Sequence, residues 1–323
     1  MCTAVSLKLK DHYFGRNLDY EHSFGENIII TPRNFPFIYR NKTTANAHYS
    51  IIGMGIVQDH FPLYFDATNE AGLSVAGLNF PDNACYFNFA PKKENITPFE
   101  LIPWLLCKYN TVRECCVACK NLQIVNIPFN SQLELSPLHW IVADKNESIV
   151  IESTKDGLHV YDNPYGVLTN NPPFPYHLSN ICNYINLSAQ EPIDRFSNNI
   201  ILNPYSRGMG AIGLPGDNSS ASRFVRAAFT KLNSKCSNTE ESAVTQFFHI
   251  LNAVYQVNGC TAVGNLYEKT LYSSCCNTTK GIYYYTTYGN PQIHAVHLSA
   301  INLDDSALKI FPLNKEPNFV TAL

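Results

Sequence analysis

Apolar and polar residues alternate through much of the chain, which is typical of strands with one buried face. The predicted strands span residues 3–9, 13–18, 28–32, 49–57, 73–80, 138–144, 148–153, 158–161, 270–275, 281–287 and 292–298. Helical spacing appears between residues 98 and 122, with a break and a helix cap predicted at Asn110 and Thr111. The two longest helical patterns cover residues 219–231 and 240–257.

The order of these blocks indicates the fold class. Strands, helices, strands, helices and strands follow one another, which favours an α+β layered domain over a parallel β/α alternation. With apolar faces on both strand blocks, we expect two sheets packed face to face and covered by helices. No linker or internal repeat interrupts the sequence, so residues 1–323 are predicted to form one domain.

Composition excludes several classes of protein. Of the 323 residues, 45% are hydrophobic and 15% charged, which supports a sizeable core and excludes a disordered chain. The net charge is −3, so there is no electrostatic case for nucleic acid or an anionic membrane. The longest apolar run, 101–107, is far shorter than the ~20 residues that span a bilayer.

The cysteines and the first ten residues suggest a compartment. The segment from Met1 to Lys10 has neither the basic region nor the apolar stretch of a secretory signal. There are 11 cysteines, an odd number at low density. We therefore expect reduced thiols and a cytoplasmic location.

Cys2 is the strongest candidate for chemistry. Removal of Met1 leaves a residue that carries both a thiol and a free α-amine, and an α-amine with a pKa of ~7.7–8.0 is partly an unprotonated base near neutral pH. The segment 14–19 supplies Arg16 and Asp19 on a second strand, directly after a turn at 10–12. Pairing of the two strands brings Asp19 towards the α-amine and Arg16 towards the thiol. The alternative is an edge hairpin whose Arg16 and Asp19 face solvent.

Several short motifs occur together and in order along the chain. They are Met1-Cys2-Thr3, Phe14–Asp19, Thr31-Pro32-Arg33-Asn34, Ala76-Gly77-Leu78-Asn79-Phe80, Leu168-Thr169-Asn170 and Ala221-Ser222-Arg223-Phe224. From Cys2 to about Pro312 the chain resembles the choloylglycine hydrolase family, N-terminal-nucleophile hydrolases that include bile salt hydrolases and penicillin V acylases. The resemblance implies a four-layer αββα sandwich and an amide hydrolase that needs no metal or organic cofactor.

The resemblance also implies a role for each matching residue. Cys2 is the expected nucleophile with its α-amine as base, Asp19 the partner of that amine, and Arg16 the neighbour of the thiol. Asn170 and the backbone N–H of Asn79 are the expected oxyanion hole. Arg223 matches the remaining active-site arginine, near the start of a helix.

Two positions bear on the substrate that the resemblance implies. Bile salt hydrolases resemble this chain in having asparagine at the position of Asn79, where penicillin V acylases usually carry tyrosine. The triplet Ser206-Arg207-Gly208 resembles the version associated with taurine conjugates, and a guanidinium can bind a sulfonate through charge-assisted hydrogen bonds. We therefore expect a conjugated bile salt as substrate, with taurine preferred over glycine.

The last two predictions concern the pocket for the substrate and the oligomeric state. A steroid needs an apolar pocket, and two loop candidates, 61–65 and 127–129, offer Phe61 and Phe129. The segment 190–205 resembles the protruding assembly hairpin of the family, which implies a homotetramer.

Other functions stay open at this stage. A penicillin V acylase would share every catalytic residue. A non-catalytic bile-salt-binding protein would retain Met1 and so lack the free α-amine. Cys115, Cys116 and Cys119 invite a zinc site but lack a second ligand pair. Another cysteine hydrolase would pair an internal cysteine with His139 or His249.

Overall fold

The computed structural model describes residues 1–41 and 43–321 and contains two large antiparallel sheets. The six-stranded sheet runs in the order β14 (Val167–Leu168), β1 (Cys2–Lys8), β2 (His12–Tyr20), β17 (Lys269–Asn277), β18 (Ile282–Thr287) and β19 (His294–His297). The eight-stranded sheet runs in the order β13 (Gly157–Asp162), β12 (Ser148–Thr154), β11 (Leu138–Ala143), β8 (Ser74–Asn79), β7 (Phe61–Asn69), β6 (Ile51–Gln58), β3 (Asn27–Thr31) and β20 (Lys309–Pro312).

Short helices and strands complete the described chain. The helices are α1 (Leu101–Lys108), α2 (Val112–Cys119), α3 (Phe174–Asn180), α4 (Ser220–Asn233) and α5 (Glu240–Asn252), with 3₁₀ turns η1 (Ile181–Tyr184), η2 (Met209–Ala211) and η3 (Leu298–Ala300). The small two-stranded sheets pair β4 (Phe37–Ile38) with β5 (Thr44–Ala45), β9 (Glu94–Ile96) with β10 (Leu122–Ile124), and β15 (Ala262–Val263) with β16 (Leu266–Tyr267). None of the helices in these residues is long and apolar enough to cross a membrane.

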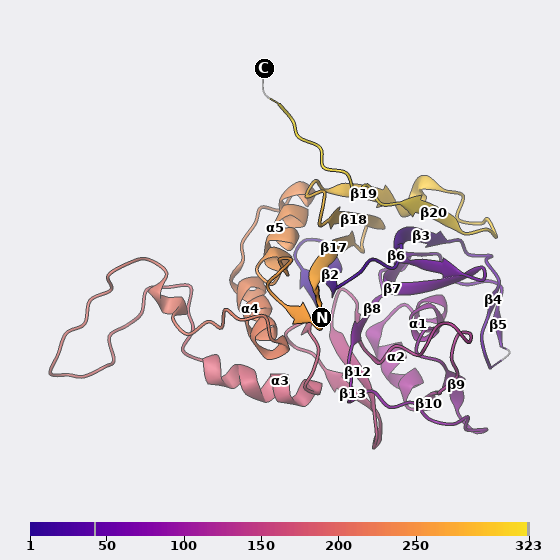
Figure 1. Ribbon diagram of the computed structural model, residues 1–323, viewed down its shortest axis with the longest axis horizontal. Helices are drawn as coiled ribbons and strands as arrows, with labels where there is room; N and C mark the ends of the chain where they lie inside the picture. The colour runs from indigo at the N-terminus through magenta and orange to yellow at the C-terminus, as the bar shows by residue number, and fades with distance from the viewer. Residues whose placement is uncertain (42, 322–323) are drawn as a thin grey trace.

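The elements stack in four layers. Helices α4 and α5 pack against β1 and β17 of the six-stranded sheet, whereas α1 packs against β7 and β8 of the eight-stranded sheet (Figure 1). One apolar core fills the space between the two sheets and beneath α4 and α5, and a second lies beneath α1 and α2. The expectation of an α+β, four-layer αββα sandwich is confirmed, because two sheets with apolar inner faces bury them against each other.

The helical boundaries follow the local signals in the sequence. The predicted break at Asn110 and Thr111 separates α1 from α2, and Thr111 caps α2 in a reciprocal capping box with Glu114. Ser219 caps α4 by accepting from the backbone N–H of Ser222. Helix α5 ends at Asn252, earlier than the predicted 257.

Two expectations about irregular segments were wrong in detail. Residues 61–65 are the start of strand β7 rather than a loop; Pro62 is tolerated because it lies next to the turn that begins the strand. The segment 190–205 leaves the body of the molecule as an irregular loop and contains no β-strand (Figure 1). Pro192 and Pro204 interrupt any regular ladder there.

Candidate active site

The hairpin of β1 and β2 places Cys2 and Arg16 on one face of the six-stranded sheet. Cys2 pairs with Leu18 and Ala4 pairs with Arg16, so these four residues alternate with a second set that faces α4 and α5. Cys2, with 4% of its surface exposed, lies in a cavity of about 260 Å³ that Arg16 also lines. The structure therefore brings the expected nucleophile and the expected neighbour of the thiol together.

Arg16 is a buried cation held by backbone oxygens. Its Nη1 donates to the carbonyl of Phe65 at 3.1 Å and to the carbonyl of Gly77, while Nη2 is buried without a hydrogen-bond partner. Burial opposes the charge, but the nearby Cys2, Tyr272 and Asp66 outweigh it and raise the pKa of Arg16. The guanidinium stays charged beside the thiol.

Asp19 lies on the opposite face of β2, because it is three positions after Arg16 and side chains alternate between the two faces of a strand. Its Oδ1 accepts from Thr270 Oγ1 at 2.6 Å, and its Oδ2 is buried without a partner. Its backbone carbonyl accepts from the amine of Met1 at 2.8 Å. Burial raises the pKa of Asp19, against the opposing charges of Arg223 and of the Met1 amine.

Asn170 and Arg223 close the site from outside the hairpin. Asn170 Oδ1 accepts from the backbone N–H of Cys2 at 2.8 Å and from Arg223 Nη2 at 2.7 Å. Its Nδ2 donates to the carbonyl of Asn79 at 2.7 Å and carries a second hydrogen. Arg223 also donates to the carbonyl of Cys2 and to Thr3 Oγ1. The expected oxyanion-hole residues thus surround Cys2, and Asn79 lines its cavity.

Met1 occupies the space beyond Cys2. Its amine donates to Glu268 Oε1 at 2.7 Å as well as to Asp19. While Met1 is attached, the nitrogen of Cys2 is a peptide N–H, which cannot act as a base. The thiol and its surroundings are assembled, and the base that the sequence predicts requires the Met1–Cys2 bond to be cut.

The cavity at Cys2 is mainly apolar. Most of its lining is aliphatic or aromatic: Leu18, Tyr20, Phe24, Ile56, Leu63, Tyr64, Phe65, Pro98, Phe99, Ile102, Phe129, Leu133, Leu135, Pro137 and Leu138. Phe129, predicted to bind substrate, lines the cavity, whereas Phe61 packs behind it with ring centroids 6.1 Å apart. Ser206 and Arg207 do not line the cavity and are exposed in the protruding loop.

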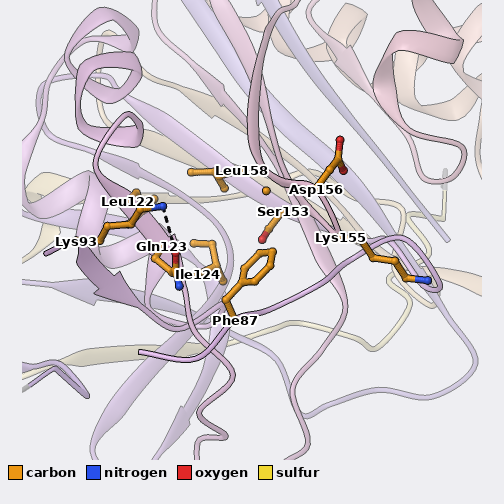
Figure 2. Close-up of a pocket in the computed structure, with 10 residues that line it drawn as sticks. Phe87, Lys93, Leu122, Gln123, Ile124, Ser153, Lys155, Asp156 and Leu158 are labelled. Atoms are coloured by element: carbon orange, nitrogen blue, oxygen red, sulfur yellow. Dashed lines mark hydrogen bonds between the residues drawn. The ribbon is translucent and has the colours of Figure 1, made fainter. Parts of the chain in front are cut away.

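A separate cavity of about 220 Å³ contains none of the predicted site residues (Figure 2). Lys93 and Lys155 both line it, and Lys93 donates to Gln123 Oε1 at 3.2 Å. Its hydroxyl, from Ser153, donates to the carbonyl of Cys85 at 2.6 Å and is therefore not activated by a base. Of these two cavities, the one at Cys2 is the one that holds the expected nucleophile.

Three residues near the site were missed from the sequence. Thr270 donates to Asp19, and Thr3 accepts from Arg223. Asp66 accepts from Tyr272 and Tyr283, and burial raises its pKa against the charge of Arg16. Only Thr3 had a signal, because it follows Cys2 in the first motif; the other two reach the site through the pairing of distant strands.

The other cysteine alternatives find no support in side-chain geometry. Cys115 and Cys119 are buried on α2, and burial raises the pKa of Cys119 to about 12. In residues 1–41 and 43–321, no three His, Cys, Asp or Glu side chains are grouped as metal ligands. The two ring nitrogens of His139 contact Glu152 and Thr169 rather than a thiol.

Two stacked antiparallel sheets covered by helices, with a buried cysteine at the start of β1, define a fold of the N-terminal-nucleophile hydrolase type. Residues 2–311 match the linear amide C–N hydrolases of the choloylglycine hydrolase family. The chain belongs to this family and is a C–N amide hydrolase.

Comparisons with individual proteins agree. The chain is 54% identical to a bile salt hydrolase/transferase of Lactiplantibacillus plantarum over 99% of each chain. It is similar to a solved mutant of the conjugated bile acid hydrolase of Clostridium perfringens, with a TM-score of 0.93, 38% identity and full coverage of both chains. A penicillin V acylase of Agrobacterium tumefaciens shares the fold, with a TM-score of 0.75 and 18% identity over 98% of this chain and 92% of that one.

Proposed function

We propose that the protein hydrolyses the amide bond of conjugated bile salts through a thioester on Cys2. The observation that carries the proposal is the placement of the Cys2 thiol in an apolar cavity, beside Arg16 and flanked by Asn170 and Asn79. A steroid suits the aliphatic and aromatic lining, and the amide carbonyl then faces the thiol. The name of the 54% identical relative supports the same substrate.

The reaction begins once Met1 has been removed. Two observations support this step: Cys2 N already faces Asn170 Oδ1 at 2.8 Å, and Asp19 Oδ2 is buried without a partner. A free α-ammonium at this nitrogen has more hydrogens than a peptide N–H and can satisfy additional acceptors. Loss of Met1 also removes its ion pair with Glu268.

The chemistry then proceeds in two halves. The α-amine takes the thiol proton, and Cys2 sulfur bonds to the amide carbon while Asn170 Nδ2 and the Asn79 backbone N–H stabilise the oxyanion. The α-ammonium protonates the leaving nitrogen as the C–N bond breaks. Water then attacks the thioester and gives a proton to the α-amine, and the C–S bond breaks to release the bile acid.

The test is the release of taurine and glycine from taurocholate and glycocholate by protein shown by intact mass to begin at Cys2. Penicillin V serves as the competing substrate. Turnover of both bile salts is expected. Turnover of penicillin V alone would keep the Cys2 mechanism and overturn the substrate, and binding without turnover would favour the non-catalytic alternative.

We also propose that the protein assembles as a homotetramer through the protruding loop. Large apolar side chains are exposed there: Ile185, Ile193, Phe196, Ile200, Ile201, Leu202, Tyr205 and Ile212. Such a cluster favours burial against another copy. Sedimentation of the wild type and of a double Phe196→Ser, Ile201→Ser variant tests this, with a tetramer expected only for the wild type.

The same loop bears the proposed taurine preference. Arg207 is exposed and does not line the cavity of its own chain, so it can meet a sulfonate only if the loop of one copy reaches the cavity of another. A cytoplasmic location, in which Cys2 stays reduced, completes the proposal.

A second candidate function is acyl transfer to an amine, which the name of the 54% identical relative, a bile salt hydrolase/transferase, favours. The thioester carbon would bond to the nitrogen of an amino acid instead of water, with loss of the C–S bond and return of a proton to Cys2. Incubation of glycocholate with taurine should then yield taurocholate, detected by mass spectrometry. Only free bile acid would be found if water alone reaches the thioester.

A further inference from the structure

Behind Asn170 lies a cluster of two histidines and one glutamate that the proposed mechanism does not use. His139 on β11, Glu152 on β12 and His177 on α3 are each fully buried. His139 lies flat against Phe80, with ring centroids 4.3 Å apart and planes within 5°. Buried polar groups of this kind are costly unless each hydrogen bond is made, so their partners indicate their task.

The partners of the two histidines are the backbone carbonyls of the loop that carries Asn170. His139 Nε2 lies 3.0 Å from the carbonyl oxygen of Thr169, and His177 Nε2 lies 3.0 Å from that of Asn170. On the other side, Ser220 Oγ accepts from the backbone N–H of Asn170 at 2.8 Å. The main chain of Asn170 is therefore held from both sides, and its amide is directed at Cys2.

Hydrogen counting shows that His139 and Glu152 share a proton. A carbonyl oxygen only accepts, so His139 Nε2 carries a hydrogen. His139 Nδ1 lies 3.0 Å from Glu152 Oε1, and the backbone N–H of Phe174 also donates to Glu152. A lone pair on Nδ1 facing an ionised carboxylate would be repulsive, so one proton must lie between them. His177 differs, because burial lowers its pKa and its Nδ1 has no partner.

We propose that His139 and Glu152 are positioning residues for Asn170, acting through the hydrogen bond from His139 to Thr169. The inference rests on the oxyanion role of Asn170 in the proposed function. The shared proton keeps the imidazole upright between Glu152 and Thr169. Without the shared proton, His139 no longer holds its Nε2–H against the Thr169 carbonyl. That buried carbonyl then loses its donor, and the peptide that carries Asn170 moves relative to Cys2.

Four variants test the pair. Glu152→Gln keeps the hydrogen bond to His139 and one of the two contacts with Phe174, because its amide nitrogen donates to His139 Nδ1 and its oxygen accepts from the backbone N–H of Phe174. Glu152→Ala and His139→Phe remove the shared hydrogen bond, and phenylalanine retains the stacking on Phe80. His12→Phe is the matched control, since His12 is a buried histidine with two hydroxyl partners at the far end of the β1–β2 hairpin.

The expected result is a fall in kcat with glycocholate of up to about 10²-fold in Glu152→Ala and His139→Phe, with KM within about twofold of wild type. Glu152→Gln should remain within about threefold in kcat, and His12→Phe should be unchanged. A wild-type kcat in His139→Phe, a Glu152→Gln variant as slow as Glu152→Ala, or an equal loss in His12→Phe would each overturn the proposal.

A second readout does not depend on turnover. The side-chain amide resonance of Asn170, assigned by its loss in Asn170→Asp, should shift in His139→Phe and Glu152→Ala but not in Glu152→Gln or His12→Phe. An unshifted resonance in His139→Phe would overturn the positioning role. If the wild type fails to hydrolyse any bile salt while the resonance moves as expected, the proposed function fails and the positioning role stands.

Discussion

The two ends of the β1–β2 hairpin differ in how they treat buried polar groups. At the Cys2 end, Arg16 is a buried cation and Asp19 a buried carboxyl group, and each has one polar atom without a partner. At the His12 end, Ser6 Oγ bonds to His12 Nε2 at 2.9 Å and Thr278 Oγ1 to His12 Nδ1 at 2.8 Å. Burial lowers the pKa of His12 to about 4, so the His12 imidazole is uncharged near neutral pH.

The two ends therefore differ in what their polar atoms do. At the Cys2 end some polar atoms are left without a partner, whereas at the His12 end the polar atoms bond to one another and stabilise the fold. Unpartnered buried atoms cost stability and are kept where a substrate or a new amine will satisfy them. The neutral cluster of Ser6, His12 and Thr278 has its side chains hydrogen-bonded to one another, so it stabilises the turn between the strands and needs no ligand. The same two strands thus carry unpaired buried polar atoms at one end and a hydrogen-bonded polar cluster at the other.

The largest expected effect is loss of the nucleophile. Cys2→Ser should lower kcat by roughly 10⁴-fold or more, because a serine hydroxyl is a far weaker nucleophile than a thiolate beside Arg16. The unfolding midpoint should stay near that of wild type. Steady-state kinetics with taurocholate and a thermal melt on the same sample measure both, and unchanged turnover would end the Cys2 mechanism.

The next effect concerns the oxyanion. Asn170→Ala removes a donor to the transition state and should lower kcat by ~10²–10³-fold. Ser220→Ala is the matched comparison, since it removes the hydrogen bonds of the Ser220 hydroxyl to the backbone N–H of Asn170 and to Thr169 Oγ1 but leaves the side-chain amide of Asn170 in place. If Asn170→Ala changed KM alone, Asn170 would bind substrate rather than stabilise the oxyanion.

At the His12 end the expected effect is on stability rather than on rate. Because the folded pKa of about 4 lies below the usual 6.5, the unfolded chain takes up a proton first as the pH falls. Stability contributed by neutral His12 is complete above pH 6.5 and declines by about 3 kcal/mol between pH 6.5 and 4.

His12→Phe lacks this titration. Urea unfolding at pH 7 and pH 4 should therefore show the gap between wild type and variant shrinking by about 3 kcal/mol. A gap that is the same at both pH values would mean that His12 is charged in the folded protein or titrates normally there.

The smallest expected effect lies at neither end of the hairpin. Arg207→Ala should lower kcat/KM for taurocholate about two- to fivefold and leave glycocholate unchanged, because an exposed ion pair contributes little. Arg195, another arginine of the protruding loop, offers a matched control as Arg195→Ala. Equal losses for both substrates would remove Arg207 from any role in choosing taurine.

The catalytic end of the hairpin could be predicted from the sequence because its residues are close along the chain. Cys2, Arg16 and Asp19 belong to one hairpin, and period-2 alternation gave both strands. The placement of Asn170 and Arg223 came from the resemblance, since nothing local in either segment indicates that it reaches Cys2.

The supporting residues could not be predicted, for a physical reason. Thr270 and Asp66 meet the site through strand pairing and sheet packing over long sequence separations, which periodicity does not report. His139 and Glu152 had the same limitation: each lies in a strand that was predicted, yet their contact depends on the register of β11 and β12. The protruding segment was expected from the resemblance as a hairpin. Its lack of strands was not expected, because it depends on Pro192 and Pro204, which the resemblance did not bring into the prediction.

The Met1 amine donates hydrogen bonds to Glu268 and to the Asp19 carbonyl, and these bonds have a practical consequence for preparing the protein. An affinity tag fused ahead of Met1 would displace that amine from its two acceptors and deny an aminopeptidase the methionine it must cleave. At the other end of the chain, residues 313–321 follow β20 and run outward from the body of the molecule (Figure 1). Purification handles therefore belong at the carboxyl terminus, and kinetics from amino-terminally tagged samples would report on a blocked precursor.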